Sequence, residues 1–127
     1  MGQPGTPTAN PFDVQKLIGD IGAAVNGVVQ KDLTTYEAYI QRQTQGIAHQ
    51  AEWIAESFVA GMIDIGTRDF FLKQLADTTA VFAKTVAGLA LITIEKVWNA
   101  VVDVLWRSIN TAIGAALPLP PLPQQSA

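Results

Sequence analysis

Apolar residues recur with a helical period along almost the whole chain, and this feature limits the possible folds more than any other. In residues 13–29, and again in residues 33–65, they stand three and four positions apart, on one face of a helix. The second series contains no proline and is long enough for one helix of about 30 residues, roughly 45 Å at 1.5 Å per residue. A third series begins near Phe71 and continues to Leu117. The sequence therefore predicts an all-α protein, either a long amphipathic helical hairpin or a three- or four-helix bundle, and we expect it to be oligomeric.

Glycines mark the expected breaks between these helices. Gly66 suits the left-handed position that ends a helix, and the hydroxyl of Thr67 can accept a backbone N–H of the next helix. We therefore expect the chain to fold back at these two residues. A further break near Gly88 would give four helices instead of three. The segment 89–94 is partly β-branched, but it lies between helical patterns and does not predict a strand.

Both ends of the chain are rich in proline, which cannot continue a helix. Residues 1–11 are expected to form a flexible arm, and residues 118–127 a proline-rich tail of polyproline II type. Such a tail can dock into an aromatic groove of a partner, but a helix stop followed by a spacer is the favoured interpretation. The residues between, 12–117, are expected to form a single helical domain.

The composition excludes several classes of function. None of the 127 residues is cysteine, which excludes a disulfide scaffold, zinc–thiolate sites and thiol catalysis. Only 15% of the residues are charged, the net charge is −3, and Lys and Arg form no run, so nucleic-acid binding is not expected. An apolar window of about 18 residues, which a membrane span needs, is absent, and so is an export signal. We expect no transmembrane segment and a cytoplasmic location.

The most informative segment is 94–116. On a helical wheel its apolar residues cover an arc of about 200°, nearly twice the stripe of a usual surface helix. Three explanations stay open: the helix is central in its own domain, it is covered by a second copy, or it adsorbs to a lipid or polymer surface. Because its polar side is balanced in charge, adsorption would be driven by apolar burial rather than by anionic headgroups. We predict a hydrophobic surface or interface formed by Ile94, Val97, Trp98, Val101, Val102, Leu105, Trp106, Ile109 and Ile113.

The sequence contains no recognisable catalytic motif. His49 is the only histidine, and Glu52 and Glu56 share its helical face. A di-iron carboxylate bundle needs Glu-x-x-His on two helices, whereas this chain has one histidine in the reverse order. A solvated polar face is therefore the favoured interpretation, and a metal enzyme built round these three residues is the least favoured alternative. We expect no enzymatic activity, no metal site and no cofactor.

Three short motifs resemble one known family. Asn10-Pro11-Phe12-Asp13 followed by Lys16-Leu17, the pair Arg42-Gln43 before a long amphipathic helix, and the segment 68–74, Arg-Asp-Phe-Phe-Leu-Lys-Gln, are similar to segments of the phasins, which coat polyhydroxyalkanoate storage granules in bacteria. The resemblance covers about residues 10–90. The chain departs from the family in its last forty residues, which are rich in Trp and Val and end in prolines, where phasins are commonly rich in Ala and Lys. The resemblance implies a non-enzymatic, helix-rich, often oligomeric granule coat without catalytic residues.

The sequence thus leads to one main functional hypothesis and one rival. The main hypothesis is a phasin-like protein that covers hydrophobic storage granules through amphipathic helices, located in the cytoplasm at the granule surface. Its partners would be a second copy of the chain and a hydrophobic granule or lipid surface. The rival is a self-assembling structural subunit of a helical homo-oligomer, such as a filament or shell component, without a lipid or polymer target.

Overall fold

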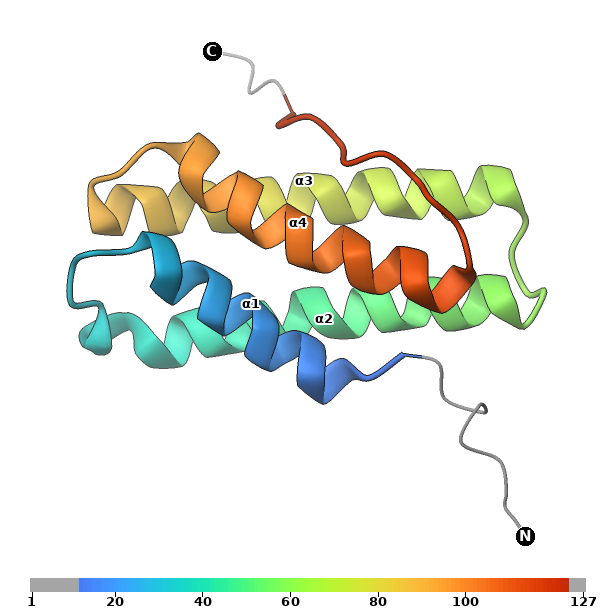
Figure 1. The fold of residues 1–127 in the computed structure, drawn as a ribbon, viewed down its shortest axis with the longest axis horizontal. Helices are drawn as coiled ribbons and strands as arrows, with labels where there is room; N and C mark the ends of the chain where they lie inside the picture. The colour runs from blue at the N-terminus through green and yellow to red at the C-terminus, as the bar shows by residue number, and fades with distance from the viewer. Residues whose placement is uncertain (1–11, 124–127) are drawn as a thin grey trace, which may run out of the picture.

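Four helices, each antiparallel to the next, make up residues 12–123, the part of the chain that the computed structural model describes (Figure 1). They are α1 (Val14–Val28), α2 (Glu37–Val59), α3 (Ile65–Ala90) and α4 (Ile94–Ile113), with a short 3₁₀ turn, η2 (Thr34–Tyr36), before α2. The prediction of an all-α fold of the bundle type is confirmed, and residues 12–123 contain no strand. The expected arm at residues 1–11 and the end of the tail at residues 124–127 lie outside the described residues.

The first helix has nearly the bounds that the apolar period predicts. Its N-terminus is fixed by Asp13, whose carboxylate Oδ1 accepts the backbone N–H of Lys16 at 3.0 Å. A carboxylate at this position satisfies one of the N–H groups that the first turn of a helix leaves without a partner. Phe12, just before the cap, is buried with an exposed fraction of only 2%. The start of α1 is thus held by one cap and one buried ring.

The second apolar series does not form one helix over residues 33–65, and that prediction is wrong at both ends. At its start, the Asp32 carboxylate accepts both the backbone N–H and the hydroxyl of Thr34, and these bonds lower the pKa of Asp32. They hold the chain in a turn, so that α2 begins only at Glu37. At its end, Gly61 takes the left-handed conformation with φ of 76°, which glycine adopts without steric cost, and α2 stops at Val59.

The expected turn at Gly66 and Thr67 is also wrong, because α3 begins earlier. The N-cap is Asp64, whose Oδ1 accepts the backbone N–H of Thr67 at 2.8 Å. Thr67 is therefore the residue that is capped, and Gly66 lies in the first helical turn. An Asp side chain reaches the N–H three residues ahead as well as a Thr side chain does, so position alone decided between them.

The break near Gly88 does not occur at that residue. Helix α3 continues to Ala90, and the chain turns at Leu91, which adopts φ of 61° although it is not a glycine. Thr93 then caps α4 by accepting the N–H of Lys96 at 3.4 Å. The expectation of four helices rather than three, with a break near Gly88, is confirmed, and the left-handed residue that ends α3 is a leucine.

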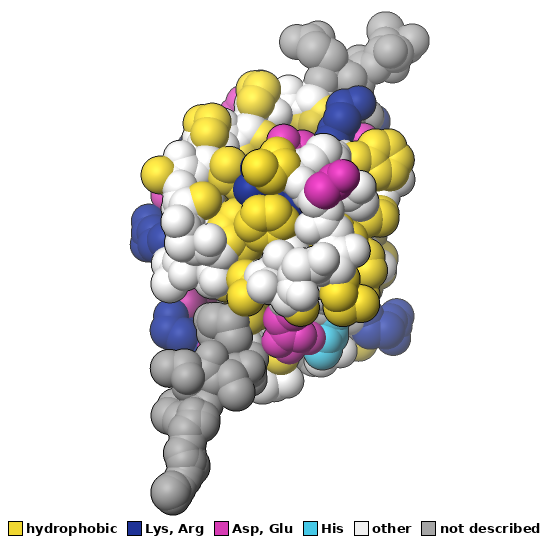
Figure 2. All heavy atoms as spheres, turned by 90° about the vertical axis from the view of Figure 1, so that its right-hand side faces the viewer, with side chains coloured by type: hydrophobic (Ala, Val, Ile, Leu, Met, Phe, Trp, Pro, Cys, Tyr) yellow, Lys and Arg dark blue, Asp and Glu magenta, His cyan; other side chains and the backbone are white. Residues whose placement is uncertain are grey.

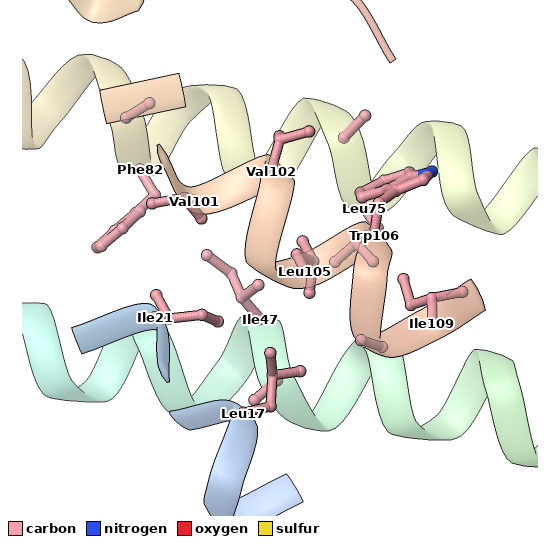
Figure 3. Close-up of a cluster of buried hydrophobic side chains, with 14 of the residues drawn as sticks. Leu17, Ile21, Ile47, Leu75, Phe82, Val101, Val102, Leu105, Trp106 and Ile109 are labelled. Carbon is pink, nitrogen blue, oxygen red and sulfur yellow. The ribbon is translucent and has the colours of Figure 1, made fainter. Parts of the chain in front are cut away.

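Helix α4 contacts all three other helices, whereas α1 and α3 lie at opposite corners of the bundle. Figure 1 shows α1 and α4 crossing in front of the longer pair α2 and α3. In Figure 3, side chains of all four helices meet between the ribbons, among them Leu17, Ile47, Phe82 and Leu105. Each of these four is at most 1% exposed. A helix that packs against three neighbours needs an apolar arc wider than that of a helix with one neighbour, which accounts for the wheel of α4.

Candidate functional site

The apolar face predicted for binding is the core of the bundle. Seven of its nine residues are at most 3% exposed, namely Val97, Trp98, Val101, Val102, Leu105, Trp106 and Ile109. The other two, Ile94 and Ile113, are partly buried and pack against the same core. Of the three explanations for the wide arc, the structure therefore shows the first, a helix central in its own domain. In the folded chain this face does not form a free surface, which corrects the expectation that it is one.

The candidate metal residues on α2 lie on an exposed surface. His49 Nδ1 and Glu52 Oε1 are 3.4 Å apart, and the His49 side chain is more than half exposed. Within residues 12–123, no group of three or more His, Asp or Glu side chains is placed to hold a metal ion. The arrangement fits the solvated polar face that the sequence favours.

The apolar side chains that do reach the surface gather at one end of the bundle. Of nine large hydrophobic residues classed as exposed in residues 12–123, five fall within residues 53–70, around the turn between α2 and α3. Figure 2 looks onto this end and shows many apolar side chains among polar ones. We call this group the hairpin-end patch, and its exposed members are Trp53, Val59, Met62, Ile65 and Phe70, with exposed fractions from 50% to 75%.

Three aromatic rings form the fixed part of the hairpin-end patch. The ring of Phe71 meets Trp53 of α2 edge to face, with centroids 5.1 Å apart and an angle of 86° between the planes. Phe71 also packs against Phe70, with centroids at 5.6 Å. Edge-to-face pairs at such distances are favourable beyond the area they bury. They hold the Trp53 and Phe70 rings in place while about half of each side chain stays in solvent.

Charge near the hairpin-end patch is paired. Arg68 is almost fully buried, lies with its guanidinium 4.8 Å from the centre of the Phe58 ring, and donates to the Asp69 carboxylate at 2.9 and 3.0 Å. The N–H of Thr67 that Asp64 accepts lowers the pKa of that carboxyl, so it is ionised at neutral pH. A cation beside two carboxylates gives this end no positive field, and anionic ligands would not be attracted to it.

Sequence reasoning placed these residues differently. Met62 and Ile65 follow the apolar period of the second series, which predicts core positions for them. One signal was available: Phe70 stands one position before Phe71, where the third apolar series begins, and adjacent residues of a helix point about 100° apart. Phe70 therefore lies away from the centre of the apolar face that contains Phe71.

An open groove with a volume of about 640 Å³ lies between α1 and α4. Its charged side chains are paired with carboxylates one helical turn away. Lys16 Nζ lies 2.8 Å from Asp20, which raises the pKa of that lysine, and Arg107 pairs with Asp103. The groove therefore offers no accumulated charge to a ligand.

Comparisons of the chain with protein-family models, with curated proteins and with solved structures found no match. None of the helices in residues 12–123 has both the length and the apolar character of a membrane span. Support for a function therefore comes from the residues and their geometry.

Proposed function

We propose that this protein is a non-enzymatic, phasin-like coat of hydrophobic storage granules, and that it adsorbs to them through the hairpin-end patch. The observation that carries the proposal is the gathering of exposed apolar side chains, two of them aromatic and held by ring contacts, at one end of a closed bundle. Soluble monomers rarely expose contiguous apolar patches of more than a few hundred Å², and larger ones mark contact sites. The excess of carboxylates over cations around it fits a neutral body better than an anionic membrane.

The expected adsorption is weak for one copy and reversible. Burial of a large apolar side chain contributes about 1.5–3 kcal/mol, so a half-exposed one adds about 1 kcal/mol when it is covered. Five such side chains give at most roughly 5 kcal/mol, which alone would correspond to a Kd of about 0.2 mM, and the cost of association makes the affinity of one copy weaker than that. When many copies coat one particle and contact one another, these weak contacts together are enough to keep the coat bound.

The phasin-like segments occupy definite places in the bundle. Asp13 of the first segment caps α1, and Arg42 and Gln43 of the second lie on α2. The third, residues 68–74, lies inside α3 rather than at a turn, since that helix begins at Ile65. The last two segments therefore both belong to the hairpin of α2 and α3, which carries the hairpin-end patch.

The test is co-sedimentation with polyhydroxybutyrate beads and, in parallel, with neutral liposomes. The double substitution Met62→Ser with Phe70→Ser removes two side chains of the patch that are 75% and 57% exposed. The matched control, Val81→Ser with Leu91→Ser, removes two that are 59% and 78% exposed elsewhere on the surface. We expect the patch variant to lose at least roughly tenfold in bead affinity, from about 1 kcal/mol per side chain, and the control to bind like the unmodified chain.

Two results would refute the proposal. The first is equal binding by both variants, and the second is no saturable binding by the unmodified chain. A fixed oligomer that dissociates in the patch variant but not in the control would favour the rival function, a self-assembling subunit. Trp98→Asp would not be informative, because it places a carboxylate in the core and any loss of binding would report unfolding.

A further inference from the structure

The proline-rich segment after α4 turns back along the bundle. Gly114 has φ of 67°, and its left-handed conformation reverses the chain at the end of α4, where the N–H of Ala115 is accepted by the carbonyl of Asn110 at 3.1 Å. Figure 1 shows the red segment running back beside α4. We call residues 117–123 the strap. The interpretation of this segment as a mere spacer does not describe how it lies.

A single side chain fastens the strap to α4. The Asn110 amide donates through Nδ2 to the carbonyl of Leu117 and accepts the Leu117 N–H at Oδ1, both at 3.0 Å. Four of the seven strap residues are prolines and have no N–H to donate. Within residues 12–123 the strap makes no other hydrogen bond. Beyond this latch it is held by apolar contact, with Leu117 and Leu122 packed against the core.

The strap is loosely seated between its two ends. Leu119, at its middle, is 52% exposed. On one side a hollow of about 580 Å³ separates Leu119 and Pro120 from α4, where Trp98 and Val102 form part of the wall. On the other side a second hollow, of about 400 Å³, lies between Leu119 and the polar side of α4. A covering segment with open space on both sides gains little dispersion energy from its middle residues.

We propose that the strap is a releasable cover, and that it opens as a unit to expose the edge of α4 that carries Trp98 and Val102, while the four helices stay folded. Release needs only the loss of the Asn110 latch and of the Leu117 and Leu122 contacts, which are few interactions compared with those of the bundle. This inference does not rest on the proposed function, because the strap and the hairpin-end patch involve different residues.

The absence of cysteine from the chain allows a clean test with the full-length protein. The substitution Val102→Cys places one thiol in the wall of the hollow that Leu119 and Pro120 of the strap also line, at a position 1% exposed, and Leu105→Cys places one on the core side of the same helix, at 0%. The rate of reaction with a disulfide reagent such as DTNB is measured for each. We expect the thiol introduced at position 102 to react at least roughly tenfold faster than the one at 105, because strap opening reaches it without unfolding of the bundle.

Two further substitutions loosen the strap from opposite sides. Asn110→Ala removes both hydrogen bonds of the latch, and Leu122→Ser removes an apolar anchor in the strap itself. Asn110→Ala should accelerate labelling at position 102 by roughly 10- to 30-fold, the factor expected for losing two ordinary hydrogen bonds. Leu122→Ser should accelerate it by roughly tenfold through the lost apolar burial, and both should leave labelling at 105 unchanged. Asn26→Ala on α1 and Leu119→Ser in the exposed middle of the strap are the matched controls, and they should alter neither rate.

The outcomes separate a releasable strap from a fixed one. Equal labelling rates at 102 and 105, with equal responses to Asn110→Ala and Leu122→Ser, would mean that the strap leaves only when the bundle unfolds, and would overturn the proposal. Because Leu122→Ser acts from outside α4, it keeps the test valid if Asn110→Ala frays the end of that helix. Binding of polymer beads plays no part in this readout, so failure of the proposed function would leave it unaffected.

Discussion

Two tryptophans of this protein lie in opposite environments, and replacing each by alanine gives the sharpest test of the packing. Trp98 of α4 is 2% exposed and lies in the core of the bundle. Trp53 of α2 is 50% exposed and contacts the Phe71 ring edge to face. Removal of a buried Trp side chain costs about 3–5 kcal/mol of the free energy of unfolding, because it removes transfer energy and leaves a cavity. Removal of the half-exposed one should cost about 1–2 kcal/mol, partly the aromatic pair itself.

Urea unfolding followed by far-UV circular dichroism measures both changes under the same conditions. We expect the Trp98→Ala midpoint to fall well below that of Trp53→Ala, with a difference of at least about 2 kcal/mol at a common slope. The free energy of unfolding of a small domain is about 5–15 kcal/mol, so Trp98→Ala should still leave a folded population to measure. Equal losses from the two substitutions, or a larger loss from Trp53→Ala, would refute the assignment of the α4 face to the core.

Three further predictions concern single positions. Leu91→Gly should raise the free energy of unfolding, measured by urea titration, by about 0.5–1 kcal/mol. The reason is that Leu91 is 78% exposed and has a left-handed φ of 61°, which glycine adopts without steric cost. A loss of stability would contradict this. Thr44→Val should be neutral or stabilising by up to about 1 kcal/mol, since the buried Thr44 hydroxyl has no hydrogen-bond partner. Thr79→Val should destabilise the protein, since the Thr79 hydroxyl donates to the Leu75 carbonyl at 2.8 Å. The melting temperatures of the two variants test this difference. The Thr67 N–H lowers the pKa of Asp64 in the folded protein below the unfolded value of about 3.9. The ionised Asp64 carboxylate therefore contributes fully to the free energy of unfolding above that pH, and this contribution is lost as the pH falls through the folded pKa. In Asp64→Asn, the free energy of unfolding should therefore fall less steeply between about pH 5 and pH 2 than in the unmodified chain. An unchanged pH dependence in this range would contradict the role of Asp64 as the cap.

Helix boundaries were predicted correctly where only one residue in the neighbourhood could begin or end the helix. The apolar period and a capping aspartate agree at the start of α1, and its bounds were close to those expected. At the turn between α2 and α3, several residues could cap or reverse the chain within a few positions, and the sequence offers no means of ranking Gly61 and Asp64 above Gly66 and Thr67. Differences of a few tenths of a kcal/mol between good capping residues are too small to locate a boundary.

The candidate site was less predictable than the fold, because exposure is a property of the assembled helices. A helical wheel shows that α4 has a wide apolar face, but it does not show what covers that face. In the same way, Trp53 and Trp98 stand in equally apolar series, and only their places in the bundle separate a surface ring from a core ring. The periodicity did not predict the hairpin-end patch: it assigned Met62 and Ile65 to a buried stripe, although both are exposed in the structure.

What the sequence determined by itself is local: helices from the apolar period of residues 13–117, and an end to α4 before the prolines that begin at residue 118. These follow from backbone geometry and the missing N–H of proline, which act within a few residues. Only the tertiary structure decided that α4 is central, that residues 53–70 carry the exposed apolar surface, and that the strap folds back to the Asn110 latch. Those outcomes depend on how the four helices pack together, because the core is too small to bury every apolar side chain. Each apolar face is buried or exposed according to which helices lie next to it.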